Sequence, residues 1–318
     1  MNAHPFSLRQ LQYAVAIAET RGFRTAAERC HVSQPSLSAQ IAQLEEVLGV
    51  RLFERDRRRV LVTAPGEELL IRARRVLAEA DDLLGAARQA GDPLSGMLRV
   101  GVIPTVSPYL LPDIVPALRR EHTRLVVLWE EEKTGALLEK LREGRLDAGL
   151  LALVAGMDDL EHETLGEDRF LLAGPPAHPL LRSRRPVHVH DLEGETVLLL
   201  QDGHCFRDQA LAICSAGKAQ EADFRGTSLA TLTQMVAGGA GLTLLPALSV
   251  EVENRRGELA LRDFAAPRPS RTLVLAWRKQ SPRGAGLREV AATIRQARRR
   301  QGGPPGPSAT PWATSSSA

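Results

Sequence analysis

The sequence has few cysteines, little net charge and no long run of apolar residues. It contains three cysteines in 318 residues, and its formal net charge is +3. No apolar stretch approaches the roughly 18 residues that a membrane-spanning helix needs. The apolar run at residues 13–18 is too short for a signal peptide and is closely flanked by Gln12 and Glu19. We therefore expect a cytoplasmic protein without membrane contact.

The small numbers of cysteines and of net charges also limit which roles the sequence can indicate. In a reducing compartment, so few cysteines argue against a structural disulfide framework and leave redox chemistry, metal binding or core packing. The net charge is too small to indicate nucleic-acid binding by itself. With 43% hydrophobic and 25% charged residues, the chain has the composition of an ordinary soluble protein.

The N-terminal part of the chain has the helical spacing of a helix-turn-helix. A first helix is expected from Ser7, which forms a capping-box pattern with Gln10. A second helix is expected over residues 24–30, and a third from Ser33, with Pro35 in its first turn. The outer face of the third helix carries short polar side chains suited to base edges and phosphates. The predicted DNA-binding residues of this helix are Ser33, Gln34, Pro35, Ser36, Ser38 and Gln40.

A basic segment follows at residues 51–63 and is predicted to form a two-stranded wing. Arg55, Arg57 and Arg58 lie at its tip, where they are expected to contact the phosphate backbone or the minor groove. Arginines alone would equally fit a solvated surface turn. Their position directly after a helix-turn-helix favours DNA contact, and the winged helix-turn-helix domain is placed at residues 1–64.

Short motifs in this region resemble the signature of LysR-type transcriptional regulators. They are Ala26-Ala27, residues 33–38, Ile41, Leu44-Glu45, Leu48-Gly49 and residues 52–55. In that family a long linker helix follows, and residues 65–90 fit it because apolar residues recur there at helical spacing. A helix with one apolar side typically pairs with a second copy as a dimerisation strut. A core helix of a single chain is the alternative.

Beyond Met97 the pattern changes to apolar strands alternating with helices, which indicates an α/β domain. Residues 98–103 are predicted to form a buried strand, and Thr105 lies in the turn at its C-terminal end. Ligands of open α/β sheets collect at such ends, although Thr105 would equally fit a helix cap. Residues 239–246 resemble the effector domains of LysR-type regulators, which are similar to two-lobed periplasmic binding proteins.

The predicted fold is therefore α/β, with a helix-rich winged helix-turn-helix domain and a two-lobed, periplasmic-binding-protein-like sensor domain. A hinge is expected at residues 91–96, and a disordered tail rich in Gly, Pro, Ser and Thr at residues 301–318. The sensor domain is placed at residues 97–300. Its lobe I covers residues 97–167 and 270–300, and its lobe II covers residues 168–269.

Two of the cysteines, Cys205 and Cys214, lie nine residues apart. In one helix their Cα atoms would be roughly 13 Å apart, whereas a disulfide needs about 4.4–6.8 Å. The pair therefore cannot bond unless the intervening segment unwinds. Cys205 follows a Gly-His turn, at a predicted helix start with Asp202 as a candidate cap and Arg207 nearby. Helix N-termini and cationic groups lower the pKa of a thiol, which favours Cys205 as the nucleophile.

Several segments of the sensor domain resemble the OxyR branch of the LysR family, which responds to hydrogen peroxide. They are residues 101–106, 108–112, 202–205, 207–210, Cys214, residues 227–229 and residues 244–248. The resemblance implies that peroxide oxidises Cys205 to a sulfenic acid and that Cys214 resolves it as a disulfide. It also implies peroxide binding by Thr105, Thr134, His204 and Arg271.

The same resemblance implies the partners. We expect a homodimer or homotetramer that binds a double-stranded DNA operator, contacts RNA polymerase as an activator, and is reset by thioredoxin or glutaredoxin. No cofactor is expected, and a zinc site is disfavoured because His204, Cys205 and Cys214 lack a fourth ligand nearby. We do not expect an enzyme.

Other interpretations stay open at this point. Cys30 is expected to be a small buried core residue. Cys214 could be inert, so that oxidation of Cys205 alone would be the switch, and His204 could serve only to bond a backbone carbonyl. A LysR regulator that binds a metabolite without thiol chemistry would fit the same pattern. A thiol peroxidase with incidental DNA binding fits it less well, because the N-terminal DNA-binding pattern is complete.

Overall fold

The computed structural model describes residues 4–55, 60–88, 94–183 and 185–300. Contacts divide the chain into two compact units, residues 1–92 with 139–146 and residues 93–138 with 147–318. The expected tail and part of the expected hinge lie outside the described residues. Among the described helices, none combines the length and the apolar character needed to cross a membrane.

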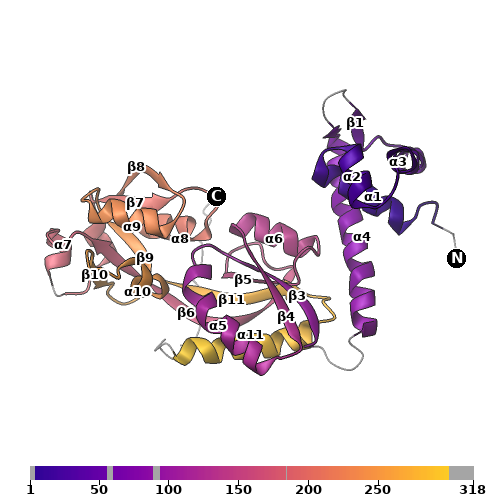
Figure 1. Cartoon of the computed structure of the whole chain (residues 1–318). Coiled ribbons are helices and arrows are strands. Elements are labelled where there is room, and N and C mark those ends of the chain that lie inside the picture. The colour runs from indigo at the N-terminus through magenta and orange to yellow at the C-terminus, as the bar shows by residue number, and fades with distance from the viewer. Residues whose placement is uncertain (1–3, 56–59, 89–93, 184, 301–318) are drawn as a thin grey trace. The chain divides into compact units, whose positions relative to one another are not determined.

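The first unit contains a winged helix-turn-helix (Figure 1). Its elements are α1 (Leu8–Thr20), α2 (Phe23–Arg29), α3 (Gln34–Leu48), β1 (Phe53–Arg55), β2 (Val60–Val62) and α4 (Ala64–Arg88). The predicted capping box is present, since Gln10 N donates to Ser7 Oγ and Ser7 N donates to Gln10 Oε1 at 2.8 Å. Ser33 caps α3 by accepting from Ser36 N at 3.3 Å.

The turn between α2 and α3 depends on one residue with left-handed backbone, His31, whose φ is 54°. The three helices then bury an aliphatic core that includes Ile17, Leu37, Ile41 and Leu44, each fully buried. The buried residues of α3 repeat at helical spacing, so its opposite face is left to solvent. This packing leaves the polar face of α3 accessible, with residues 33–36 exposed.

The second unit is α/β, as predicted. Its elements are β3 (Gly96–Val102), α5 (Ser107–Glu121), β4 (Leu125–Glu131), α6 (Thr134–Arg142), β5 (Ala148–Ala152), β6 (Leu160–Gly174), α7 (Pro179–Arg182), η1 (Val189–Leu192), β7 (Thr196–Leu200), α8 (Cys205–Ala216), β8 (Gln220–Gly226), α9 (Leu229–Ala237), β9 (Thr243–Pro246), η2 (Ala247–Ser249), α10 (Val250–Glu253), β10 (Ala260–Asp263), β11 (Ser270–Arg278) and α11 (Gly284–Arg300).

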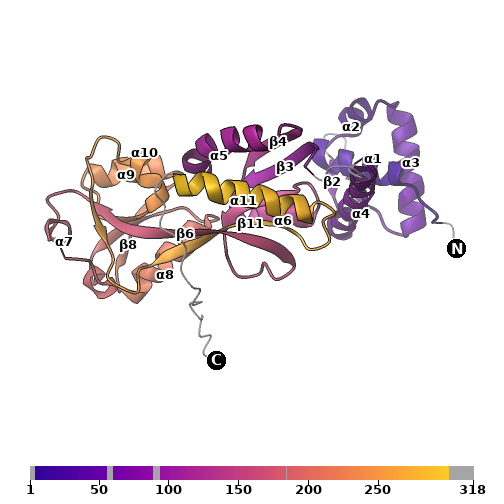
Figure 2. The same ribbon diagram turned by 90° about the horizontal axis from the view of Figure 1, so that it is seen from below.

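Two long antiparallel strands, β6 and β11, connect the two lobes of this unit. The order of the seven-stranded sheet is β10-β6-β11-β5-β3-β4, with β9 also paired to β6. The start of β6 pairs with β11 beside the parallel strands β3, β4 and β5, and its end pairs with β9 and β10. The chain therefore passes between the lobes along these strands (Figures 1 and 2).

Each lobe adds its own covering layer. In the first lobe, α5 and α11 lie side by side against the sheet (Figure 2). In the second lobe, β7 and β8 form a separate parallel pair, and α8 and α9 pack on β7. The core of the second lobe includes Phe170, Phe206 and Leu232. Helix α8 is thus anchored in this core through Phe206.

Candidate redox site and DNA-binding surface

Cys205 is the first residue of α8 and is buried. In the preceding turn, Gly203 has a φ of 91°, a backbone conformation that favours glycine. The expectation that Asp202 caps α8 is wrong, because the N-cap position belongs to His204. The Asp202 carboxylate instead accepts a hydrogen bond from Arg207 Nε at 2.8 Å.

Arg271 on β11 lies at the centre of a second group of predicted site residues. Its side chain is buried and donates from Nη1 to Thr105 Oγ1 at 2.8 Å and from Nη2 to the Thr105 carbonyl at 2.9 Å. Its Nε donates to Asp168 Oδ2 at 2.9 Å, and Asp168 Oδ1 accepts from Leu248 N. Thr105 does not cap α5, since the N-cap residue is Val106. The buried guanidinium is therefore charge-paired and held in one orientation.

Two buried polar atoms of the predicted site have no hydrogen-bond partner within the described part of the chain. They are Thr134 Oγ1 and His204 Nε2, on side chains that are 8% and 4% exposed. Buried polar atoms are almost always satisfied by protein, water or ligand. Two such atoms therefore point to a site for a small polar molecule.

Two contacts join these groups to the start of α8. The Arg271 guanidinium lies 5.8 Å from the ring centre of Phe206, the residue after Cys205. Lys133, which directly precedes Thr134, donates from Nζ to the Asp202 carbonyl at 3.2 Å. The β3–α5 turn, the start of α6, the start of α8 and β11 thus meet in one place, and bring together the residues that the sequence suggested for peroxide binding.

The imidazole of His204 is adapted to this place. Burial lowers its pKa, the neighbouring Lys133 ammonium lowers it further, and Glu131 opposes the shift. The ring is therefore neutral at neutral pH. A neutral imidazole offers one N–H donor and one acceptor nitrogen, which suits a ligand that both donates and accepts.

Cys214 occupies a very different environment on the same helix. It is 4% exposed and belongs to the apolar core of the second lobe. Burial raises its pKa to about 12, and the Glu221 carboxylate contributes to that shift. The thiol is therefore protonated at neutral pH and is a poor nucleophile where it stands.

All three cysteines are free thiols. Cys205 and Cys214 are held nine residues apart on the continuous helix α8, which separates their Cα atoms by about 13 Å. Cys30, expected to be a small buried core residue, follows α2 and is half-buried. It packs against the edge of the helix-turn-helix core.

The predicted DNA-binding residues of α3 lie on its accessible side. Ser33, Gln34, Pro35 and Ser36 are exposed at the start of the helix, and Ser38 and Gln40 are half-buried. Arg55 ends β1, whereas Arg57 and Arg58 lie outside the described residues. The N-terminal turn of α3 is therefore the best-defined part of this surface.

Sequence reasoning missed the residues that hold these sites in place. Asp168 orients Arg271, and Glu45 Oε1 accepts from Leu52 N at 2.7 Å and Phe53 N at 3.2 Å, which fixes the wing to α3. Glu221 bonds Arg207. Glu45 stood out only as part of the LysR motif, and nothing in the local sequence distinguishes Asp168 and Glu221 from ordinary surface carboxylates, because their partners lie 103 and 14 positions away in the chain.

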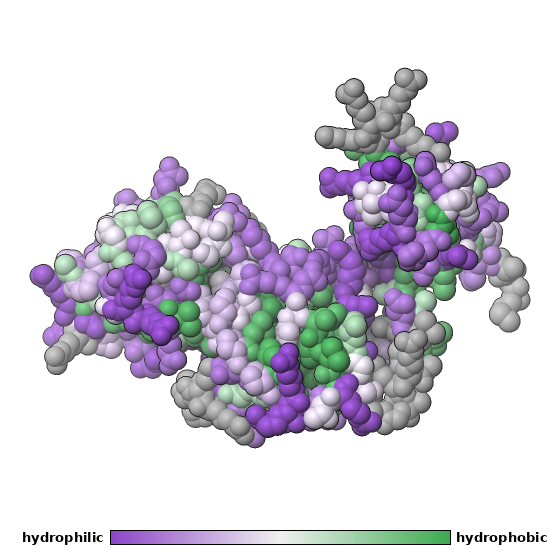
Figure 3. Space-filling model, viewed as in Figure 1, coloured by the Kyte–Doolittle hydropathy of each residue, from purple (hydrophilic) through white to green (hydrophobic). Residues whose placement is uncertain are grey.

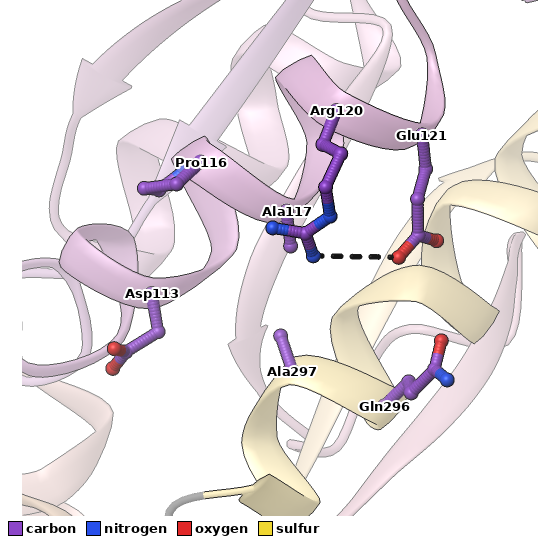
Figure 4. Close-up of a pocket in the computed structure, with 7 residues that line it drawn as sticks. All are labelled: Asp113, Pro116, Ala117, Arg120, Glu121, Gln296 and Ala297. Carbon is purple, nitrogen blue, oxygen red and sulfur yellow. Dashed lines mark ion pairs between the residues drawn. The ribbon is translucent and has the colours of Figure 1, made fainter.

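The described pockets do not offer a competing centre. Figure 4 shows one of 210 Å³ between α5 and α11, with an ion pair of 3.7 Å between Arg120 and Glu121. It shares no residue with the redox site. A larger hollow of 730 Å³ includes Asp168 and Leu248 in its lining and so borders the support of Arg271. In the described ranges no His, Cys, Asp and Glu side chains cluster as a metal site would require.

Comparisons with known proteins cover nearly the whole chain. Residues 8–67 match the bacterial regulatory helix-turn-helix proteins of the lysR family, and residues 91–299 match the LysR substrate binding domain. A "Hydrogen peroxide-inducible genes activator" of Pectobacterium carotovorum is 45% identical over 291 residues, 91% of this chain and 96% of the relative. The chain belongs to the LysR family of transcriptional regulators, in its OxyR branch.

Solved structures agree with this LysR assignment. A full-length OxyR variant from Pseudomonas aeruginosa has a TM-score of 0.77 at 36% identity, covering 92% of this chain and 96% of its own. A peroxide-bound OxyR mutant from Corynebacterium glutamicum has a TM-score of 0.63 at 35% identity, with coverages of 94% and 96%. LysR proteins are DNA-binding regulators, so this chain is a regulator of transcription and not an enzyme.

Proposed function

We propose that this regulator senses hydrogen peroxide by oxidation of Cys205, which Cys214 then resolves as a disulfide. The observation that carries the proposal is the place where Cys205 stands. It begins α8 directly after the neutral His204, where Lys133 bonds the Asp202 carbonyl and Arg271 lies over the Phe206 ring. One compared relative is named as a hydrogen peroxide-inducible activator, and one compared structure is peroxide-bound. Both support hydrogen peroxide as the signal.

The residues supply what the first step needs. The Cys205 sulfur, at the start of α8, is the nucleophile. Thr134 Oγ1 and His204 Nε2 bond the peroxide hydroxyls, while Thr105 and Arg271 polarise the oxygen that leaves. The thiolate attacks the other oxygen, a sulfur–oxygen bond forms and the oxygen–oxygen bond breaks. Hydroxide leaves and takes up a proton to become water, so sulfur loses two electrons and peroxide gains them.

The second step joins the cysteines. The Cys214 sulfur attacks the sulfenic sulfur of Cys205, the sulfur–oxygen bond breaks, and the hydroxyl leaves as water with the Cys214 proton. A disulfide needs Cα atoms about 4.4–6.8 Å apart, so α8 must unwind before it forms. A dithiol such as that of thioredoxin or glutaredoxin returns two electrons and restores both thiols.

The change in α8 then reaches DNA through an assembly of copies. We place the winged domain at residues 1–64, the dimerisation helix at 65–90 and the sensor at 97–300. On α4, Val76 and Leu83 are 45% and 72% exposed, as a helix that pairs with a second copy would be. In the sensor, Figure 3 shows hydrophobic side chains gathered over α5 and β4, where Val126 and Leu128 are exposed. Such surfaces mark protein contacts.

The assembly is proposed to be a homodimer or homotetramer on a double-stranded DNA operator, with the polar start of α3 in the major groove. A disulfide that reshapes the second lobe alters how sensor domains pack, and so the spacing of the DNA-binding domains. Activation through RNA polymerase would follow from the changed arrangement on the operator.

The test is direct mapping of thiols. Reduced protein is treated with a stoichiometric series of hydrogen peroxide, free thiols are blocked, and peptides are analysed by mass spectrometry. A Cys205–Cys214 peptide that rises near equimolar peroxide and disappears with dithiol is the expected result. Sulfenate at Cys205 without a bridge would make the switch a one-cysteine device. No modification at either residue would contradict peroxide sensing.

A further inference from the structure

An ion-pair network centred on the buried Arg207 crosses the first turn of α8, between Cys205 and Cys214. Arg207 has a side chain that is 8% exposed and donates to both oxygens of Glu221, at 2.7 and 3.2 Å. It also donates to Asp202 Oδ1 at 2.8 Å and to the Leu200 carbonyl at 3.3 Å. One guanidinium thus ties α8 to the end of β7, to the turn before the helix and to β8.

The partners of Arg207 differ in strength. The Glu221 side chain is 30% exposed and binds the guanidinium through two parallel bonds, a geometry that strengthens a charge pair. The Asp202 side chain is 75% exposed, so its attraction is screened by water. Glu221 is therefore the dominant partner.

The other end of α8 is fastened by backbone contacts instead. A side chain at Gly217 would come within 2.3 Å of the Val189 carbonyl oxygen, so the chain there packs closely on η1. Gly194 N donates to the Lys218 carbonyl and Gln220 N to the Glu195 carbonyl, at 3.2 and 2.8 Å. Since these backbone contacts hold the Cys214 end, we expect opening to begin at the first turn of α8, where the fastening is by side chains.

We infer that the Arg207–Glu221 pair is a latch that holds the first turn of α8 closed and sets the rate at which Cys205 sulfenic acid reaches Cys214. This rests on the proposed peroxide switch. Both residues are positioning residues that contact neither peroxide nor the reacting sulfurs. Breaking the latch lowers the barrier to unwinding, so disulfide formation accelerates while oxidation of Cys205 does not. The raised pKa of Cys214, to which Glu221 contributes, fits a resolving thiol kept inactive until the helix opens.

The experiment measures the two steps separately in the full chain. Rapid quenching with a thiol-blocking reagent and mass spectrometry give the rate of Cys205 oxidation, in a Cys214→Ser background, and the rate of disulfide appearance with Cys214 present. Glu221→Gln is expected to raise the second rate about tenfold or more, because a charged hydrogen-bonded pair opposes opening by at least that ratio. The first rate is expected to stay within about twofold, since peroxide is bound elsewhere.

Two further variants separate the latch from simpler explanations. Arg207→Met breaks the pair but keeps the Glu221 charge beside Cys214, so it is also expected to speed disulfide formation. If only Glu221→Gln forms the disulfide faster, the effect of the Glu221 charge on the Cys214 thiol is responsible, and the latch is overturned. Glu193→Gln is the matched control. It removes an exposed ion pair with Lys218 at the other end of α8 and is expected to change neither rate.

The outcomes also distinguish this inference from the proposed function. If peroxide oxidises Cys205 in the parent protein but both latch variants form the disulfide at the parental rate, the latch is wrong and the switch stands. If Cys205 is not oxidised at all, the switch itself fails. Circular dichroism in urea shows whether each variant is folded, and Glu221→Asp, which keeps the charge, is expected to give an intermediate rate if Gln unfolds the protein.

Discussion

The two ends of α8 carry the same kind of side chain in opposite surroundings. At the start, Cys205 follows the neutral imidazole of His204 and precedes Phe206, over whose ring the Arg271 guanidinium lies. Near the end, Cys214 is enclosed by aliphatic side chains that raise its pKa to about 12. One helix therefore presents one thiol to a polar site and hides the other in a core.

This difference explains how two identical functional groups can act in order. A thiol at the edge of a polar site can meet a small oxidant that is bound there, whereas a protonated thiol in an apolar core is a poor nucleophile. The second thiol becomes useful only when the helix that separates it from the first is disrupted. The stability of α8 is thus part of the chemistry, and the predictions below test each end in turn.

The largest expected effect comes from removing the reactive thiol. Cys205→Ser should abolish the peroxide-induced change in DNA binding and leave Cys214 unmodified, because the buried thiol is protonated. Transcription in vitro from an operator, with and without peroxide, measures the loss. Cys30→Ser is the control and should respond as the parent does. A Cys205→Ser protein that still answers peroxide would show that the two ends do not have separate roles.

Replacing Arg271 should cost both stability and reactivity. Arg271→Met leaves the Asp168 carboxylate buried without its partner, which destabilises the fold by about 3–5 kcal/mol in comparable buried pairs. Arg169→Met, which removes a half-exposed pair with Asp263, should cost at most about 1 kcal/mol. Urea unfolding measures the stability of both variants. Equal losses in the two variants would mean that Arg271 is not the buried anchor described above.

Thr134 offers a way to remove ligand contact without weakening the fold. Its hydroxyl has no protein partner among the described residues, so Thr134→Val should leave the free energy of unfolding within about 0.5 kcal/mol of the parent. Oxidation of Cys205 should slow about tenfold, the ratio expected for the loss of one hydrogen bond to a reacting group. Stopped-flow oxidation and urea unfolding measure the two effects. A loss of stability with unchanged oxidation would assign Thr134 a structural role.

The smallest effect concerns the pH dependence of stability. Folding lowers the pKa of His204 below its usual value, which is about 6.5 in an unfolded chain. Between these two values the unfolded chain binds more protons, so folding stability falls as the pH drops below about 6.5. His204→Gln should flatten the dependence of folding stability on pH in this region, as measured by urea unfolding between about pH 5 and 7. An unchanged slope would mean that His204 is not desolvated.

Much of this fold follows from local sequence patterns. The helix-turn-helix was predicted from the spacing of residues such as Leu37, Ile41 and Leu44, which are buried together. The strand at 98–103 was predicted from a short apolar run and lies within two residues of β3. Apolar periodicity reports which face of an element is buried, and these elements have one clear buried face or are buried throughout.

The first part of β6, which runs between the lobes, was not predicted. The first part of β6, with Glu161, His162 and Glu163, alternates half-buried and exposed positions, and β8 and β11 were missed as well. Their charged residues pair with distant arginines, as Glu163 does with Arg295. Such pairs are set by tertiary packing, which local sequence does not encode. For the same reason the sequence indicated Cys205 and Thr105 but gave no sign of Asp168 or Glu221.

The most direct test of the account is hydrogen exchange along α8 in the reduced and peroxide-treated proteins, with the thiols of each sample mapped in parallel. We predict that amides of the first turn lose protection when the Cys205–Cys214 disulfide forms, while strands of the first lobe such as β3 keep theirs. A protein that carries the disulfide and retains full protection throughout residues 205–216 would contradict the claim that the helix must open for its two ends to meet.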